Sequence, residues 1–439
     1  MNLYSVCSYR PRADRSPGLV YYSGSNPPTR IKGADRVAVE DYQIAHRESN
    51  QIAHKESNQI ANKQSNNIQL RGLINLGNLC FANSIFQSLV FCQPFYQMMI
   101  GLSTQLPFSF NKTPLLDATI AFLQQFNPTN DMNDMNDIGE PFTPTLIYDA
   151  LKQYNRFNTI HRGQQEDAEE FLGFFLDTLH EELVSISPRL KPRTRWFDGV
   201  DSPDDSNEWL QVGHKNKTLN KPSTPSNPTE SPISKLFGGK FRSTLKTPGQ
   251  KDSITLEPFQ PLQLDIQPDH IHSIEDALLN LAQPETIHGV YSPSKQGPVD
   301  ATKQVTIDTS PPILIIHLKR FLYHSVGGVM KSNKRITYQP TLSIPNSILS
   351  PWNTPADGLH YRLFAVVYHH GQNSGSGHYT IDVLRQDLKQ WVHIDDIVMN
   401  FLDENHVVET EYGSSGNNNS NGSSANNDKT AYLLLYSKM

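Results

Sequence analysis

Cysteine is scarce in this sequence: three occur in 439 residues, at Cys7, Cys80 and Cys92. Three thiols in a chain of this length cannot form a disulfide framework, which excludes the small cross-linked secreted domains. Such a count is typical of a reducing compartment, so we expect a cytoplasmic protein, with the nucleus as a second location. The same count leaves a thiol free for chemistry.

Two further absences narrow the range of partners. The formal net charge is −6 and no basic block could follow a phosphate backbone, so we expect no nucleic-acid partner. No apolar run is long enough to span a bilayer, and residues 1–12 lack the apolar core of a signal peptide, so we expect no membrane association. The 439 residues have room for two or three domains or for one large catalytic domain.

The first 69 residues are poor in large apolar side chains and rich in Ser, Asn, Gln and Arg. They contain an imperfect eight-residue repeat with starts at Ile44, Ile52 and Ile60. One isoleucine and one alanine per repeat cannot bury a helix, so we expect a low-complexity, disordered segment over 1–69. A second polar stretch, from about 185 to 232, is rich in Pro, Ser and Asn and is expected to be a linker.

The stretch from Gly72 to Leu89 combines a loop with a helix. Gly72 and Gly77 are unfavourable in a helix, whereas the apolar residues after Cys80 recur at helical spacing and predict one buried stripe. The stripe consists of Ala82, Ile85, Phe86, Leu89 and Val90. Cys80 therefore lies where a loop becomes a helix, and the unpaired amides and the helix dipole there favour a thiolate. We expect a nucleophile; the alternative is a cysteine that only packs.

A cysteine nucleophile needs a base, and the base needs a group that holds its tautomer. Residues 378–383 and 391–395 are two alternating runs joined by a polar turn centred near residues 386–387. In an antiparallel hairpin folded there, His378 and Asp395 are equidistant from the turn and face each other about 5 Å apart. The hairpin thus predicts a His–Asp couple, and a slip of its register by one residue is the open alternative.

The remaining apolar patterns predict further helices and strands. A helix with an acidic first turn is expected over 165–183, and Ser273 is expected to cap a short helix that ends at Leu281. Strands are expected at 262–266, 313–316, 363–368 and 431–436. His317, directly after one of these strands, is expected to be structural.

Four motifs, in this order, resemble those of the ubiquitin-specific proteases. Residues 72–83 resemble the cysteine box, whose usual form is Gly-Leu-x-Asn-x-Gly-Asn-Thr-Cys-Tyr-x-Asn. Residues 163–172 resemble the family's Gln-Glu-Asp-Ala-x-Glu-Phe-Leu segment, and residues 316–321 resemble the inner strand of its palm. Residues 377–379 and 391–396 resemble its histidine box.

The resemblance implies an α+β fold of the papain-like cysteine protease type, with thumb, palm and fingers, in a catalytic domain over 70–438. The thumb would cover about 71–185, and the palm and fingers about 233–438. It also implies a deubiquitinating cysteine protease, which hydrolyses the bond between the C-terminal glycine of ubiquitin and a lysine through a thioester. The partners would be ubiquitin and ubiquitinated proteins, and adaptor proteins are left open.

The resemblance also implies a role for each matched residue. Cys80 is the nucleophile, His378 the base and Asp395 the residue that orients it. Asn75 is the oxyanion donor. Asp396 matches a second acidic position that can assist His378.

Two more positions, Asp167 and Tyr379, match residues that hold the extended C-terminal tail of ubiquitin. The cysteine box departs from its usual form at Leu79, where Thr is usual, and at Phe81, where Tyr is usual. Neither replacement removes a group that does chemistry.

The expected fingers, at about 238–305, contain no cysteine, whereas many family members bind structural zinc there through two Cys-x-x-Cys pairs. His270, His272 and His288 lack a thiolate partner, so we expect them in solvent or core roles, and we expect no metal and no cofactor. Strand pairing and apolar packing would hold the fingers instead. The expected contributors are Leu262, Leu264, Ile266 and Val305.

Two alternatives to an active deubiquitinase remain open. One is a catalytically silent scaffold that keeps the fold and binds ubiquitin; the joint presence of Cys80, His378, Asp395 and Asn75 favours the enzyme over it. The other is an unrelated thiol hydrolase or acyltransferase, which would make the four motifs coincidental.

Overall fold

Every residue described below lies in one compact unit of the chain, Gln64–Met439. The computed structural model describes residues 68–104, 112–127, 138–158, 164–187, 230–323, 329–351, 355, 357–373, 376–386, 389–409 and 429–439. The predictions for Cys7, for the repeats and for most of the polar linker lie outside these residues. None of the described helices is long and apolar enough to cross a membrane.

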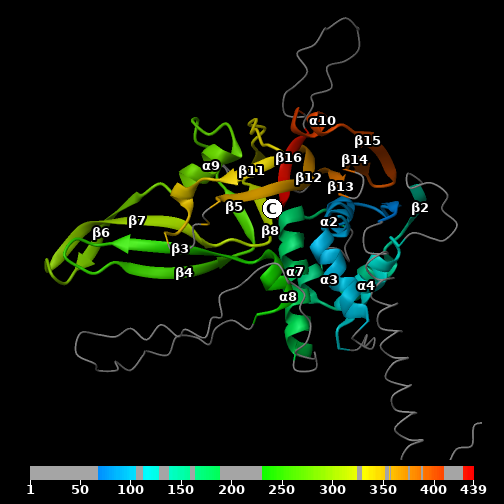
Figure 1. Cartoon of the computed structure of the whole chain (residues 1–439), viewed down its shortest axis with the longest axis horizontal. Coiled ribbons are helices and arrows are strands. Elements are labelled where there is room, and N and C mark those ends of the chain that lie inside the picture. The colour runs from blue at the N-terminus through cyan, green and yellow to red at the C-terminus, as the bar shows by residue number, and fades with distance from the viewer. Residues whose placement is uncertain are drawn as a thin grey trace, which may run out of the picture. The chain divides into compact units, whose positions relative to one another are not determined.

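A helical lobe is built around α2 (Cys80–Val90), every residue of which is buried. Phe81 and Phe86 of α2 meet Phe171 of α7 (Ala168–Ile186) edge-on, at ring-centroid distances of 5.3 and 5.6 Å. The other helices of this lobe are α3 (Gln93–Ser103), α4 (Pro114–Gln124), α5 (Thr145–Leu151), η1 (Asn155–Phe157) and α8 (Pro232–Phe237). This lobe corresponds to the predicted thumb (Figure 1).

The predicted apolar stripe on α2 is buried, but the opposite face of the helix is buried as well. Polar residues on that face contact β1 (Leu70–Leu73) and its continuation: Gln87 Nε2 donates to the carbonyl of Arg71 at 2.8 Å. Buried polar groups of this kind are stabilising only when they are hydrogen-bonded. The helix is therefore fixed in rotation by hydrogen bonds as well as by apolar packing.

The largest sheet has eight strands in the order β15-β14-β13-β12-β16-β8-β5, with β11 paired to β12. Its strands are β5 (Pro261–Leu264), β8 (Ile313–Leu318), β11 (Thr341–Ile344), β12 (Leu359–Asn373), β13 (Ser376–Arg385), β14 (Gln390–Asp395), β15 (Val398–Leu402) and β16 (Thr430–Lys438). β8 is buried along its whole length, as its run of apolar residues predicts. This sheet is the palm and, through β13, it faces α2.

A second sheet of four strands projects away from the other two parts (Figure 1). Its order is β4-β3-β7-β6, formed by β3 (Gly239–Lys246), β4 (Ser253–Phe259), β6 (Glu285–Ser292) and β7 (Gly297–Thr309). The rings of Phe241 and Phe259 stack across it with centroids 4.3 Å apart. These are the fingers.

One expectation about the fingers is wrong. Leu262 and Leu264 lie in β5, which pairs in parallel with β8, so they belong to the core of the palm. Ile266, which follows β5, is also fully buried. The alternating pattern identified the strand correctly, but such a pattern does not say which sheet a strand joins.

Short elements complete the described part of the chain. They are β2 (Ile138–Phe142), which pairs in parallel with β1, β9 (Phe321–Tyr323), β10 (Val329–Lys331), α9 (Ile274–Leu281), η3 (Asn346–Ile348) and α10 (Glu404–Glu409). Ser273 caps α9 in a reciprocal capping box with Asp276, as predicted. The helix predicted over 165–183 begins at Ala168 instead, because Asp167 is its N-cap and its side chain accepts the N–H of Glu169.

Candidate active site

Cys80 is the first residue of α2, at the end of the loop that the glycines predict. Gly77 and Asn78 both have positive φ, 120° and 53°, a region that few residues other than glycine and asparagine adopt. Leu79, the N-cap, provides no side-chain cap. The side-chain carbonyl of Asn75 accepts the N–H groups of Gly77 and Leu79 instead, at 3.0 and 3.1 Å. Asn75 therefore shapes the loop that presents the thiol.

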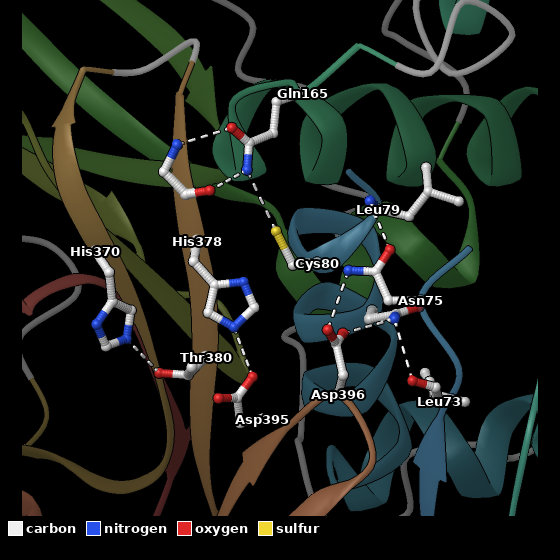
Figure 2. Close-up of polar contacts among 12 residues, drawn as sticks. Leu73, Asn75, Leu79, Cys80, Gln165, His370, His378, Thr380, Asp395 and Asp396 are labelled. Atoms are coloured by element: carbon white, nitrogen blue, oxygen red, sulfur yellow. Dashed lines mark hydrogen bonds and ion pairs between the residues drawn. The ribbon is translucent and has the colours of Figure 1, made fainter. Parts of the chain in front are cut away.

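His378 on β13 lies beside Asp395 at the end of β14, with Nε2 2.6 Å from Oδ1 (Figure 2). The predicted His–Asp contact is confirmed, but the predicted register is not. Arg385 pairs with Gln390, so the hairpin turns one residue later than expected, and Asp395 lies across from position 380 rather than 378. This shift moves the residue opposite Asp395 by two positions along β13, so His378 and Asp395 stay on the same face of the sheet. They are then diagonal neighbours, and side chains in that arrangement can still contact each other.

The thiol and the imidazole stabilise each other's charged forms. Burial alone would raise the pKa of the Cys80 thiol; hydrogen bonds from His378, from the backbone of Tyr379 and from Gln165 outweigh it and lower that pKa. The hydrogen bond with Cys80 raises the pKa of His378 to about 9 against the effect of burial, and Asp395 adds to the rise. Each group therefore favours the charged form of the other, and the thiolate is the reactive form of a cysteine nucleophile.

Gln165, which sequence reasoning missed, lies over the thiol from the segment before α7. Its Nε2 is 3.5 Å from Cys80 Sγ and also donates to the carbonyl of Gly377, whose N–H donates to Gln165 Oε1 at 2.8 Å (Figure 2). The amide thus pairs with the N–H and C=O of one residue of β13, as a neighbouring strand would. The matched motif contains this glutamine, so the signal was present at residues 163–172.

The hydrogen-bond partners of Asp396 differ from those expected of a residue that assists His378. Its carboxylate accepts from Asn75 Nδ2 at 3.0 Å and from Asn83 Nδ2 at 2.9 Å, and no hydrogen bond to the imidazole is formed. Its backbone is left-handed, with φ of 51°, and its carbonyl accepts the N–H of Leu73. Asp396 therefore ties the β14–β15 turn to the loop and helix that carry Cys80.

Asn83 is a second residue that sequence reasoning missed. It is buried on α2, where its amide donates to Asp396 and its carbonyl accepts the hydroxyl of Tyr148 at 2.8 Å. The Asn75 amide lies beside Cys80 and is the group expected to donate to an oxyanion (Figure 2). One of its two N–H groups is directed to Asp396, so the other is available for that task.

The two residues expected to hold a ubiquitin tail are engaged inside the protein. Both Asp167 oxygens accept hydrogen bonds, one from the Glu169 N–H and one from the Tyr432 hydroxyl at 2.6 Å. The Tyr379 side chain is 1% exposed, and its hydroxyl accepts the Ala168 N–H at 3.5 Å. The role of Tyr379 toward a ubiquitin tail stays a prediction; in this structure its ring supports the start of α7.

One group of described residues has ligand atoms close enough together for a metal ion: His378, Asp395 and Asp396, all within 4.8 Å. The same three residues form the hydrogen bonds described above. His270, which lies between β5 and α9, bonds to Asn280, and the exposed His288 in the finger sheet bonds to Asp300. His317, inside β8, is buried against the Tyr432 ring, and burial lowers its pKa to about 4, as expected of a structural histidine.

Thumb, palm and fingers around a Cys–His–Asp site define a papain-like cysteine hydrolase of the ubiquitin-specific protease type. The family Ubiquitin carboxyl-terminal hydrolase matches residues 71–436, and the chain belongs to that family, whose members are cysteine-type deubiquitinating hydrolases. A solved structure, the SAGA Ubp8/Sgf11/Sus1/Sgf73 DUB module bound to ubiquitin aldehyde, has a TM-score of 0.62 at 20% identity, over 89% of this chain and 75% of that one. At this identity the likeness shows the fold alone.

Two curated relatives are similar over most of the chain. The probable ubiquitin carboxyl-terminal hydrolase 3 of Schizosaccharomyces pombe is 41% identical over 392 residues, which are 84% of this chain and 74% of that protein. Ubiquitin carboxyl-terminal hydrolase 10 of Rattus norvegicus is 36% identical over 403 residues, 85% of this chain and 48% of that protein. The chain therefore spans about three quarters of the first and about half of the second.

Proposed function

We propose that this chain is an active deubiquitinating cysteine protease. The observation that carries the proposal is the line of contacts from Cys80 through His378 to Asp395, with the pKa of the thiol lowered and that of the imidazole raised to about 9. A scaffold that only binds ubiquitin has no need of a polarised thiol. The free thiol suits a reducing compartment, so we place the enzyme in the cytoplasm or nucleus.

The proposed reaction is acyl transfer in two steps. The Cys80 thiolate attacks the carbonyl carbon of the terminal glycine of ubiquitin, and the resulting oxyanion accepts a hydrogen bond from Asn75. His378 gives its proton to the lysine amine as the C–N bond breaks, which leaves a thioester on Cys80. His378 then takes a proton from water, the hydroxide attacks the thioester, and ubiquitin leaves with a free carboxylate while the thiolate is restored.

The roles of the neighbours follow from their contacts. Asp395 keeps the imidazole in the orientation that faces the thiol. Asp396 acts on Asn75 rather than on His378, because its carboxylate accepts the Asn75 amide. The proposed partners are ubiquitin and ubiquitinated proteins, with Asp167 at the entrance that the tail would use.

A ubiquitin probe with a C-terminal electrophile tests nucleophile and substrate class together. The wild-type chain should form a covalent adduct with one probe per chain. The variant Cys80→Ala should form none, while Cys92→Ala, a change in the other described thiol, should label like the wild type. Failure of the folded wild-type chain to label, with ubiquitin still bound, would favour the silent scaffold.

A further inference from the structure

Four large apolar side chains are exposed beside the catalytic network, on two segments far apart in the sequence. Two flank Asn75 and two follow Asp396. They are Ile74, Leu76, Ile397 and Val398, exposed by 37, 69, 53 and 54%, and we name them the apolar rim. Single exposed apolar residues are ordinary, whereas a group of them at the edge of a site marks an interaction surface.

The two segments that carry the rim are packed together. Asn75 Nδ2 donates to Asp396 Oδ2 at 3.0 Å, and the Leu73 N–H donates to the Asp396 carbonyl at 3.0 Å. A β-carbon at Gly72 would lie only 2.7 Å from the Cα of Ile397, so the backbones themselves are in contact. Val398 begins β15, the outermost strand at that end of the palm sheet as described.

The position of the rim says which part of a substrate would reach it. Gln165 and Asp396 lie on opposite sides of Cys80 (Figure 2). The Gln165 side holds the start of α7 and the Gly377 backbone, the groups that an extended ubiquitin tail would meet on its way to the thiol. A tail that reaches the thiol from the Gln165 side would place the leaving lysine on the side of the rim.

We propose that the apolar rim binds the protein that carries the cleaved lysine, through an apolar surface next to that lysine. This inference rests on the proposed deubiquitinase function and adds to it a binding site for the leaving group. The four rim side chains are uncharged, which suits an apolar protein surface and not a phosphate. The rim residues are chain neighbours of Asn75 and Asp396, which bond to each other beside Cys80, so a protein bound to the rim would lie close to the thiol.

The test compares two substrates that share ubiquitin and differ in the leaving group. One is ubiquitin joined to aminomethylcoumarin, and the other is a lysine-linked ubiquitin dimer of the linkage that the wild type cleaves fastest. The double variant Leu76→Gln, Val398→Thr makes the rim polar without adding charge near His378. We expect kcat/KM for the dimer to fall about tenfold, which is the effect of losing about one buried apolar contact. The value of kcat/KM for the coumarin substrate should stay unchanged.

The control variant is Met439→Gln, which changes an apolar side chain of similar exposure, 75%, outside the rim. It should leave both substrates unaffected. Equal kcat/KM for wild type and double variant on the dimer would overturn the proposal. An equal loss on both substrates would also overturn it, because the substitutions would then impair the catalytic step and not the binding of the leaving protein. A gain on both would mean that another segment of this chain covers the rim. If the wild type cleaved neither substrate, the proposed function itself would fail.

Discussion

Two thiols of the same lobe have pKa values shifted in opposite directions. Cys92, between α2 and α3, is fully buried, and burial raises its pKa to about 12. Cys80 is buried almost as completely, yet the hydrogen bonds that His378 and its neighbours make to it lower its pKa. Reactivity of a cysteine follows its pKa, so Cys92 is expected to be inert and Cys80 reactive. The difference arises from partners and not from exposure.

The first prediction concerns Gln165, which donates to the thiol and helps to lower its pKa. Replacement by alanine removes one donor, so the pKa of Cys80 should rise. The rate of alkylation of Cys80 by iodoacetamide, followed by mass spectrometry against pH, should show its midpoint at higher pH than in the wild type. Alkylation of Cys92 in the same samples provides the internal control and should stay negligible. An unchanged midpoint would mean that Gln165 does not act on the thiolate.

The second prediction concerns Asp395. The hydrogen bond with Cys80 and, to a smaller extent, the one with Asp395 raise the pKa of His378 to about 9. The protonated imidazole donates the proton to the leaving amine, and it is lost only as the pH rises through that value. Asp395→Asn should lower the pKa of His378, and the alkaline limb of the kcat/KM profile should move to lower pH. The loss of orientation should reduce kcat on ubiquitin–aminomethylcoumarin by about 10²–10⁴-fold.

The same hairpin contains a matched control for this change. His393 and Asp382 form a second His–Asp pair, also 2.6 Å apart, which does not contact Cys80. His393→Gln should keep the position of the alkaline limb. A shift of the limb in this control and none in Asp395→Asn would show that Asp395 does not set the pKa of His378.

At the scale of elements, a third prediction concerns the joint between α2 and the β14–β15 turn. Asn83 is buried and bonds to both Asp396 and Tyr148. Asn83→Ala leaves these two groups without that partner, which should reduce the free energy of unfolding by about 1–3 kcal/mol. Urea unfolding measures this. Tyr148→Phe, which removes one bond and keeps the ring, should cost less; an equal or larger cost would show that the link to Asp396 contributes little.

The hairpin shows what a sequence can and cannot say about such elements. Alternation places His378 and Asp395 on one face of the sheet, and that face is correct because a register change by two keeps it. The exact pairing depends on the turn, which closes between Arg385 and Gln390. Turn geometry depends on φ values, such as 52° at Lys389, that the side-chain pattern does not reveal.

The contacts of polar side chains were harder to predict than the strands. Asn83 on α2 bonds to Asp396 across more than 300 residues of chain, and no periodicity marks such a pair. Likewise the alternation of residues 262–266 predicted a strand, but only the fold shows that it joins β8 in the palm. Local patterns report burial, whereas partners depend on the tertiary structure.

A fourth prediction concerns the four-stranded finger sheet. No cysteine occurs between residues 238 and 309, and structural zinc usually requires thiolates among its four ligands. The sheet is joined by strand pairing and by the stacked rings of Phe241 and Phe259. We expect EDTA to leave both Tm and activity unchanged and elemental analysis to find no stoichiometric zinc. One tightly bound zinc per chain would contradict this and would require ligands from histidines and carboxylates.

At the scale of the whole molecule, three segments far apart in the sequence build the site. They are the loop before Cys80, the segment that begins α7 at residue 165, and the hairpin that carries His378 and Asp395. All three belong to the unit Gln64–Met439. The N-terminal end of this unit is anchored to the rest of it. The Gln69 N–H donates to the carbonyl of Phe126, and β1 pairs with β2.

The fifth prediction follows from where this unit begins. Removal of residues 1–63 cuts the chain just before the unit Gln64–Met439 and keeps Gln69 and β1, whereas removal through residue 73 would delete the strand that bonds to Asp396. The composition of the removed part cannot build a core, and none of the site residues lies in it. The shortened chain should hydrolyse ubiquitin–aminomethylcoumarin within about twofold of the full-length rate and unfold at the same Tm, while the longer deletion should lose both. A large loss of rate in a folded chain that lacks only residues 1–63 would show that the repeats contribute to the active site.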